Sequence, residues 1–426
     1  MKPQLLISAA SSGSGKTLFA LGLIRSLSKR GLQIQPYKCG TDFMDAQLLT
    51  LASDHETVHL DTWLASYTHL QHMYNKYGEK ADVCIAEGTA GLFDGRNKMQ
   101  GCSAEMAGLL NVPIILLVNA RLTGYSVAPL IYGFRHFHSH TPIAGVVFNM
   151  VSSEAHYHCL REACLDAGAD CLGYLPVSAD LKLPSKHTAL TLTARKELNN
   201  QIDKIAEIIE KQIDINRILN LCNRNFPCQY TLPYSSDTEF DTFTPPARKI
   251  KIAMARDAAF NFTHRENIEQ LKRIGNITCF SPVYGSELPE ADLVYLPGGY
   301  PELFARQLHR RHKLMEDLRN YAERGGRILA EGGGMLFLSR SLTLRQGGTS
   351  YPMANLLPLD FTMEEAKLQS GYRTLLHNGK EWRGNEYQYF RYADKSVQAP
   401  LFRHKNVIAS SKHLYWGETD LLKLWE

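Results

Sequence analysis

The sequence predicts an α/β protein made of two doubly wound domains, each built around a parallel sheet. Three observations lead to this fold class. Short apolar runs such as LLISA, VCIAEG and VPIILLVNA alternate with helix-length segments, a pattern typical of parallel strands joined by helices. The chain has 426 residues, which is enough for two or three separate hydrophobic cores. A polar, proline-containing stretch also divides the apolar runs into two groups.

That polar stretch, residues 221–249, sets the expected domain boundaries. The residues before it contain the strand-like runs LLISA, VCIAEG, VPIILLVNA and IAGVVFNM. The residues after it contain KIKIAMA, ADLVYLPGG and GGRILAEGG. The stretch itself has no sustained periodicity. We therefore expect one domain at residues 1–220 and a second at 250–426, joined by a linker at 221–249.

Composition and charge argue against several classes of partner. Hydrophobic residues make up 44% of the chain and charged residues 21%, as in ordinary globular proteins. The formal net charge of +4 is small and evenly spread, so we expect no nucleic-acid partner. No apolar run approaches the roughly 18 residues that a membrane helix needs. The nine cysteines form no CxxC pair. We expect a cytoplasmic protein with free thiols and no membrane partner.

A phosphate-binding loop is predicted where the first strand meets the first helix. The segment LLISAASSGSGKTLFALGLIRSL places a glycine-rich turn between them, with Ala10 where the strict motif has its first glycine. In such a loop the backbone amides point at the phosphates, the lysine neutralises the terminal phosphates, and the threonine hydroxyl binds Mg²⁺. The alternative is a small-residue turn that only packs helix against strand, and the strand, turn, Gly-Lys-Thr and helix in this order argue against it. The predicted ATP-binding residues are Gly13, Ser14, Gly15, Lys16 and Thr17.

Carboxylates for a magnesium ion are predicted at the ends of two further strands. The segment YKCGTDFMDAQLL carries Lys38, Asp42 and Asp45. The segment VCIAEGTAGLFDG ends a buried strand in Glu87, and Asp94 follows. Mg²⁺ prefers oxygen ligands and usually takes one or two carboxylates from protein. Ligands of open α/β sheets gather at the carboxyl ends of strands, so both segments can converge on the loop. A single acid at a strand end is more often a helix cap or a surface residue, but several such segments favour a functional site.

Long motifs in both halves resemble the cobyrinate a,c-diamide synthase family. In the first half these motifs are the P-loop, KCGTDFMDAQ, AEGTAGLFDG, GVVFN, LGYLP and LPSKHTAL. In the second half they are IAMARDAAFNFTHRENIEQL, DLVYLPGGYPEL, AERGGRILAEGGGM, GYR and RGNEYQYFR. They occur in the order and spacing of that family and cover nearly the whole chain. The related amidases of Ni-sirohydrochlorin and hydrogenobyrinate share the same signature.

The resemblance implies an amide ligase with a P-loop NTPase-like domain followed by a class I glutamine amidotransferase-like domain. In the first domain, which is similar to dethiobiotin synthetase, ATP phosphorylates a peripheral carboxylate of a corrin-type tetrapyrrole, and ammonia then displaces the phosphate. Asn149, at the end of GVVFN, matches an asparagine that reads the adenine edge. The implied metal ligands are Thr17, Asp45 and Glu87, and the implied catalytic residues are Lys16, Lys38, Asp42 and Asp94.

The second half departs from the family at its catalytic positions. The segment GGRILAEGGGMLFLSRSL predicts a strand, a sharp turn and a helix, the shape that lifts a nucleophile from a sheet edge. The family has a cysteine at this turn and a histidine that activates the thiol, whereas this chain has Gly332 and Gln388 at the matching positions. We therefore expect both groups to be lost and glutaminase activity to be absent. Gly332→Cys alone should recover little, because the thiol would lack its histidine.

Three functions are compatible with these residues. The first is ATP-dependent amidation that uses free ammonia or ammonia from another protein, and the intact synthetase half favours it. The second is activation of a related macrocycle carboxylate with a different nucleophile. The third is a pseudoenzyme that binds ATP and a tetrapyrrole without turnover. The sequence leaves open the macrocycle, its metal and the oligomeric state, a homo-oligomer included. It also leaves open whether Trp63 and Tyr372 line a macrocycle site or the core, and whether His187 is a ligand.

Overall fold

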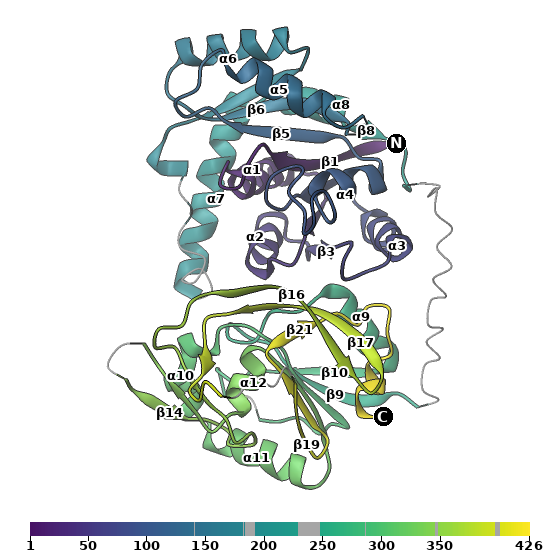
Figure 1. Ribbon diagram of the computed structural model, residues 1–426, viewed down its shortest axis with the longest axis vertical. Coiled ribbons are helices and arrows are strands. Elements are labelled where there is room, and N and C mark those ends of the chain that lie inside the picture. Colours follow the sequence, from purple (N-terminus) through teal and green to yellow (C-terminus); the bar gives the residue numbers. More distant parts are fainter. Residues whose placement is uncertain are drawn as a thin grey trace. The chain divides into compact units, whose positions relative to one another are not determined.

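The computed structural model divides into two compact units, Met1–Thr238 and Glu239–Glu426 (Figure 1). The described residues are 1–139, 141–181, 183, 192–228, 248–285, 287–345, 348–396 and 401–426. His187, for which a ligand role was left open, lies outside them. Among the described residues, no helix combines the length and the apolar character needed to cross a membrane.

The first unit is built on a sheet whose main path has the strand order β3-β2-β4-β1-β5-β6-β7. All neighbours along this path are parallel, as predicted. From the central strand β1 the chain passes to β2 and to the edge strand β3, returns to β4 beside β1, and then continues on the other side through β5, β6 and β7. The sheet is therefore doubly wound. The strands are β1 (Lys2–Ala9), β2 (Ile34–Cys39), β3 (Val58–Leu60), β4 (Val83–Glu87), β5 (Ile114–Asn119), β6 (Ile143–Val151) and β7 (Cys171–Pro176).

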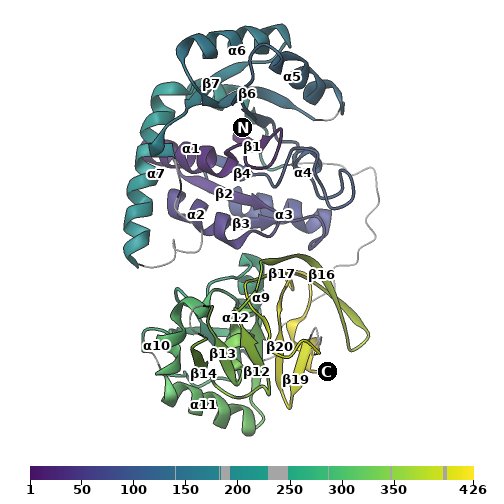
Figure 2. The same cartoon turned by 60° about the vertical axis from the view of Figure 1, so that its left-hand side comes forward.

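Helices cover both faces of this sheet (Figure 2). Right-handed crossovers place the helices that connect β1 to β2 and β2 to β3 on one face of the sheet. They place the helices that connect β4 to β5, β5 to β6 and β6 to β7 on the other face. Helices α1, α2 and α7 contact one another, and α5 contacts α6. The helices are α1 (Lys16–Lys29), α2 (Phe43–Ser53), α3 (Tyr67–Gly78), α4 (Ser103–Leu110), α5 (Val127–His136), α6 (Glu154–Asp166), α7 (Leu192–Gln212) and α8 (Ile215–Leu221), with a 3₁₀ turn at Ala179–Leu181.

The first unit extends into the stretch expected to be a linker. Strand β8 (Asn223–Arg224) pairs antiparallel with the start of β1. Cys222 is buried in the core of this unit, and the Cys228 thiol donates to the carbonyl oxygen of Leu110 at 3.0 Å. Residues 221–228 therefore belong to the first unit. Local polarity did not reveal this, because the pairing partner of β8 is at the opposite end of the domain sequence.

The second unit contains a main sheet with the order β10-β9-β11-β12-β20-β19. Its strands are parallel except β19, which runs antiparallel to β20. This sheet confirms a second doubly wound domain. The strands are β9 (Ile250–Ala255), β10 (Gly275–Phe280), β11 (Leu293–Leu296), β12 (Arg327–Glu331), β19 (Leu401–His404) and β20 (Val407–Ser410), and the helices are α9 (Arg265–Ile274), α10 (Ala305–His309), α11 (His312–Glu323) and α12 (Gly333–Leu338).

Two small, mainly antiparallel sheets accompany the main sheet of the second unit. One consists of β13 (Ser341–Thr343), β14 (Ser350–Pro352), β15 (Asp360–Thr362) and β18 (Arg391–Tyr392). The other consists of β16 (Gln369–His377), β17 (Lys380–Gln388) and β21 (Lys412–Leu414). Short 3₁₀ turns occur at Pro301–Phe304 and Leu421–Trp425. The β16-β17-β21 sheet brings residues from the end of the chain toward β12.

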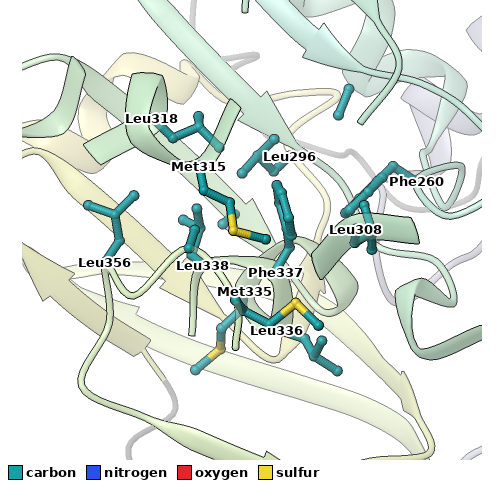
Figure 3. Packing of buried hydrophobic residues seen from close by; sticks show 14 of the residues in the cluster. Phe260, Leu296, Leu308, Met315, Leu318, Met335, Leu336, Phe337, Leu338 and Leu356 are labelled. Atoms are coloured by element: carbon teal, nitrogen blue, oxygen red, sulfur yellow. The ribbon is translucent and has the colours of Figure 1, made fainter. Parts of the chain in front are cut away.

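The core of the second unit explains the apolar run that follows its glycine turn. Met335, Leu336, Phe337 and Leu338 are all fully buried, and they pack with residues of β11, α10 and α11 (Figure 3). A helix with four consecutive buried residues must lie deep in the domain. Helix α12 is therefore a core helix, and its amino-terminal end is held where β12 ends.

Candidate functional site

The phosphate-binding loop lies between β1 and α1, and two glycines allow its shape. Gly13 and Gly15 have φ angles of +76° and +96°, the left-handed region that favours glycine. A β-carbon on Gly15 would also lie 2.2 Å from Nδ2 of Asn149. That Nδ2 donates to the carbonyl oxygen of Ser14 at 2.8 Å. Asn149 therefore braces the loop from β6.

Lys16 connects the phosphate-binding loop to the segment after β4. Its Nζ donates to the carbonyl oxygen of Ala90. Burial lowers the pKa of Lys16 below its ordinary value, and the charge of Lys38 acts in the same direction. The two ammonium groups are thus close enough to influence each other, in a place where negatively charged phosphate oxygens would be stabilised.

Thr17, Lys38, Asp45 and Glu87 come together at the carboxyl ends of β2 and β4. Lys38 and Glu87 are register partners on these strands. Nζ of Lys38 lies 3.1 Å from Oε1 of Glu87 and 3.1 Å from Oδ2 of Asp45. Oγ1 of Thr17 donates to the same Oε1 at 2.6 Å. Four of the predicted side chains therefore form one buried cluster beside the loop.

The charges of this cluster are balanced by ion pairing. Burial opposes the charge of Lys38, but Glu87 and Asp45 outweigh burial and raise its pKa well above the ordinary value. Burial raises the pKa of Glu87, and Lys38 counteracts this. A buried ammonium between two carboxylates remains charged and holds both of them in place. Lys38 therefore fixes the positions of the two predicted metal-binding acids.

The cluster has the chemistry that a magnesium ion needs. Oε2 of Glu87 is buried and has no hydrogen-bond partner among the described residues. Together with the Thr17 hydroxyl it offers hard oxygen ligands, which Mg²⁺ prefers. No group of three His, Cys, Asp or Glu side chains within the described part of the chain could hold a metal ion by itself. A magnesium ion here would thus need phosphate oxygens as additional ligands, as is usual for nucleotide sites.

Asp42 and Asp94 have structural contacts of their own. Asp42 caps α2, because its Oδ1 accepts from the backbone amides of Met44 and Asp45 at 2.9 Å each. Asp94 is exposed, and its Oδ2 accepts from the amide of Gly91 at 3.0 Å. Both positions lie in the segments that supply the cluster. Their catalytic roles stay predictions.

Sequence reasoning missed two parts of this site. One is the Ala90 carbonyl, which no side-chain pattern could reveal. The other is His59 on β3, a register partner of Lys38 whose ring lies 5.2 Å from that of Phe43. Burial lowers the pKa of His59 to about 4, so it is neutral at physiological pH. Its position at a strand end, in the segment VHLDTW, was the available signal.

The glycine turn of the second unit has the backbone shape of a nucleophile elbow. Gly332 has a φ angle of +47° between the end of β12 and the start of α12. β-carbons on Gly333 and Gly334 would lie 2.6 Å from Cδ of Pro301 and 2.1 Å from the carbonyl oxygen of Leu296. These two glycines are therefore required by close packing of α12 on the sheet, whatever chemistry the turn performs.

The expectation that no histidine serves the elbow is wrong. A β-carbon on Gly332 would lie 2.6 Å from Cε1 and 3.0 Å from Nε2 of His413. β21 pairs with β17, with His413 opposite Asn385, and this pairing carries the imidazole to the turn. Burial lowers the pKa of His413 to about 4. Gln388, the position where the histidine was expected, donates instead to Oε1 of Gln369 at 3.1 Å.

Glu331 holds β21 against the elbow. Its Oε1 accepts from the amide of Leu414 at 2.9 Å, and its Oε2 lies 2.9 Å from the hydroxyl of Tyr295. Burial raises the pKa of this carboxyl to about 8. Because Leu414 follows His413 directly, Glu331 positions the imidazole beside Gly332.

Comparisons with known proteins agree with this arrangement of two units. Residues 5–190 match the CobQ/CobB/MinD/ParA nucleotide binding domain, and residues 251–418 match the CobB/CobQ-like glutamine amidotransferase domain. The chain is 32% identical to a cobyrinate a,c-diamide synthase of Picrophilus torridus over 97% of its own length and 95% of the relative. The chain belongs to the cobyrinate a,c-diamide synthase family.

Two further members of the cobyrinate a,c-diamide synthase family match along almost the whole chain. The one from Caldanaerobacter subterraneus is 31% identical over 96% of this chain and 94% of the relative. The one from Dehalococcoides mccartyi is 32% identical over 99% of this chain and 97% of the relative. The nucleotide-binding match includes the P-loop and the Lys38 cluster, and the amidotransferase match includes Gly332 and His413. The resemblance inferred from the motifs is thereby confirmed.

Proposed function

We propose that this protein is an ATP-dependent ligase that converts peripheral carboxylates of a corrin-type tetrapyrrole, such as cobyrinate, into amides. Its relatives named cobyrinate a,c-diamide synthase support this substrate class. The observation that carries the proposal is the buried cluster of Thr17, Lys38 and Glu87 beside the phosphate-binding loop. A site that only packs a helix on a strand has no need for a buried ammonium between two carboxylates.

The proposed reaction has two steps. A substrate carboxylate attacks the terminal phosphorus of ATP, which gives an acyl phosphate and ADP. Ammonia then attacks the acyl carbon, phosphate leaves with the bond electrons, and the new amide loses a proton. The loop amides and Lys16 bind the phosphates and offset the negative charge that spreads over the transferred group. Magnesium held by Thr17, Asp45 and Glu87 would supply further positive charge to the phosphate oxygens.

The second unit supports an inference about the nitrogen source. Gly332 has no side chain, so the elbow cannot form the thioester through which an amidotransferase cysteine releases ammonia from glutamine. His413 is present, but an imidazole that lacks a thiol partner cannot begin that covalent step. We therefore infer that the ligase uses free ammonia or ammonia delivered by another protein.

The proposal is tested by phosphate release from ATP in the presence of cobyrinate, with ammonium chloride or glutamine as nitrogen donor. We expect phosphate release and amide formation, detected by mass spectrometry, with ammonium only. At fixed total ammonium the rate should rise with pH, because uncharged ammonia becomes more abundant. Phosphate release without amide would indicate another nucleophile. ATP binding without any turnover would indicate a pseudoenzyme, and glutamate release by the purified protein would contradict the nitrogen source.

A further inference from the structure

We propose that the apolar face of the macrocycle lies against an aromatic surface formed by Phe93, Phe134 and Phe137. This inference rests on the proposed function, because it names the place where the tetrapyrrole substrate of the ligase is held. Phe93 belongs to the loop after β4, and the other two residues belong to α5 and its carboxyl-terminal end. We call these three side chains and Leu130 of α5 the aromatic surface.

The aromatic surface is ordered by stacking. The rings of Phe93 and Phe134 are 5.5 Å apart between centroids and nearly parallel, with an interplanar angle of 11°. The ring of Phe137 lies 5.1 Å from that of Phe93 at an angle of 59°. Stacked rings of this kind form a firm apolar platform. Because Phe93 comes from the loop and its partners from the helix, the contact also fixes the loop relative to α5.

The aromatic surface is partly exposed to solvent. Leu130 and Phe137 are 42% and 71% exposed, whereas Phe93 and Phe134 are half-buried. On α5, Val127 and Ile131 face the domain, Phe134 lies at the border of that buried face, and Leu130 and Phe137 lie on its exposed side. Leu130 and Phe137 are two of the thirteen exposed large hydrophobic residues in the described chain. Because the ring of Phe137 also contacts that of Phe93, its exposure belongs to a larger apolar surface rather than to an isolated side chain.

The aromatic surface is directly connected to the phosphate end of the site. The carbonyl oxygen of Ala90 accepts from Nζ of Lys16, and Phe93 is three residues further along the same loop. Three residues of chain span at most about 11 Å. Asp94 is the next residue, and its carboxylate holds the loop by accepting from the amide of Gly91. A flat substrate resting on Phe93 would therefore have its rim within reach of the phosphates bound by Lys16.

The same loop carries cations suited to the rim of such a substrate. Arg96 and Lys98 are exposed, and the guanidinium carbon of Arg96 lies 5.5 Å from the ring centroid of Trp63. The backbone contacts from Gly95 to Lys98 and from Arg96 to Gln100 close a tight turn that presents both cations. A tetrapyrrole with several carboxylates has an apolar face and an anionic rim. An aromatic surface beside two cations on one short loop matches that distribution of chemistry.

The test compares Phe137→Ala with Tyr132→Ala. Tyr132 is 57% exposed on another stripe of α5, so its replacement is a matched control for losing an exposed aromatic side chain. The dissociation constant of cobyrinate is measured by equilibrium dialysis through its visible absorbance, and that of Mg·ATP by isothermal titration. We expect Phe137→Ala to raise the cobyrinate constant roughly tenfold, with Mg·ATP binding and the sedimentation coefficient unchanged. Tyr132→Ala should leave all three values unchanged.

The alternative occupant of this surface is a second copy of the chain. If Phe137→Ala alters the sedimentation coefficient, or leaves cobyrinate affinity unchanged, the aromatic surface does not hold the macrocycle and the inference is overturned. Failure of the proposed function would look different. In that case the unmodified protein would bind Mg·ATP and show no affinity for cobyrinate at all.

Discussion

The imidazole of His413 occupies the space where a β-carbon of residue 332 would lie, next to a nucleophile elbow whose residue, Gly332, has no side chain. A β-carbon on Gly332 would come within 2.6 Å of the ring, which is too close for the present arrangement. The imidazole therefore occupies the space that a side chain at position 332 would need. The elbow of the second unit therefore has no thiol, but a histidine lies beside it.

The first prediction is that Gly332→Cys alone makes the elbow reactive. The imidazole must shift to admit the new side chain, at a cost of about 1–3 kcal/mol. Once shifted it lies next to the thiol and can accept its proton. We expect labelling by a glutamine-analogue electrophile and glutamate release at least about tenfold above that of the unmodified protein. Both are measured at neutral pH by mass spectrometry and a coupled glutamate assay.

The control for this prediction is Gly332→Cys combined with His413→Gln, which should lose both signals. Adding Gln388→His to Gly332→Cys should change little, because Gln388 is held by Gln369 on β16. If only the combination with Gln388→His is active, the assignment of His413 fails.

The second prediction concerns Lys16. Lys16→Ala should lower ATP-dependent turnover by about 10²–10³-fold, because a cation that offsets phosphate charge is lost. The fold should survive, since the removed ammonium contacts only a loop carbonyl among the hydrogen bonds described. Lys29→Ala, which removes an exposed lysine at the other end of α1, is the matched control. Turnover near that of the unmodified protein in Lys16→Ala would rule out the phosphate-binding role.

The third prediction separates the acid that ends β4, Glu87, from Asp94 in the loop that follows. Glu87→Gln should weaken Mg·ATP binding by about tenfold or more, because Glu87 bonds to Thr17 and supplies a free buried oxygen. Asp94→Asn should leave Mg·ATP binding intact and lower macrocycle-dependent turnover instead. Isothermal titration and phosphate release measure the two effects. Unchanged Mg·ATP binding in Glu87→Gln would show that the metal assignment is wrong.

The fourth prediction concerns stability and pH in the second unit. Burial raises the pKa of Glu331 to about 8, from an ordinary value of 4.5. Between these values the folded state holds a proton that the unfolded state has released. The free energy of unfolding should therefore fall as pH rises from about 4.5 to 8, by at most about 1.4 kcal/mol per pH unit from this group. Glu331→Gln should flatten this dependence.

Urea unfolding followed by tryptophan fluorescence measures the effect, because Trp382, Trp416 and Trp425 all lie in the second unit. Glu290→Gln, at a carboxylate whose side chain is 84% exposed, is the control and should leave the pH dependence unchanged. The idea fails if Glu331→Gln and the unmodified protein lose stability equally with pH.

Local patterns in the sequence were sufficient to predict the parallel sheets and most residues of the nucleotide site. One short segment specifies a strand, a glycine turn and a helix that begins with Lys16. The apolar run before Glu87 likewise indicates that this residue ends a buried strand. Parallel strands then bring their carboxyl ends to one edge of the sheet. The convergence of Thr17, Lys38 and Glu87 follows from that rule and is therefore predictable from the sequence.

Tertiary structure alone decided the contacts between segments far apart in the sequence. The brace from Asn149 to Ser14 depends on the position of β6, and β8 joins the first sheet from within the expected linker. The histidine at the elbow depends on the antiparallel pairing of β17 with β21. Periodicity and motif spacing describe neighbours along the chain, whereas these contacts are set by which strands pair. For this reason the sequence by itself determined that Gly332 lacks a thiol, and only the folded chain showed that His413 stands beside it.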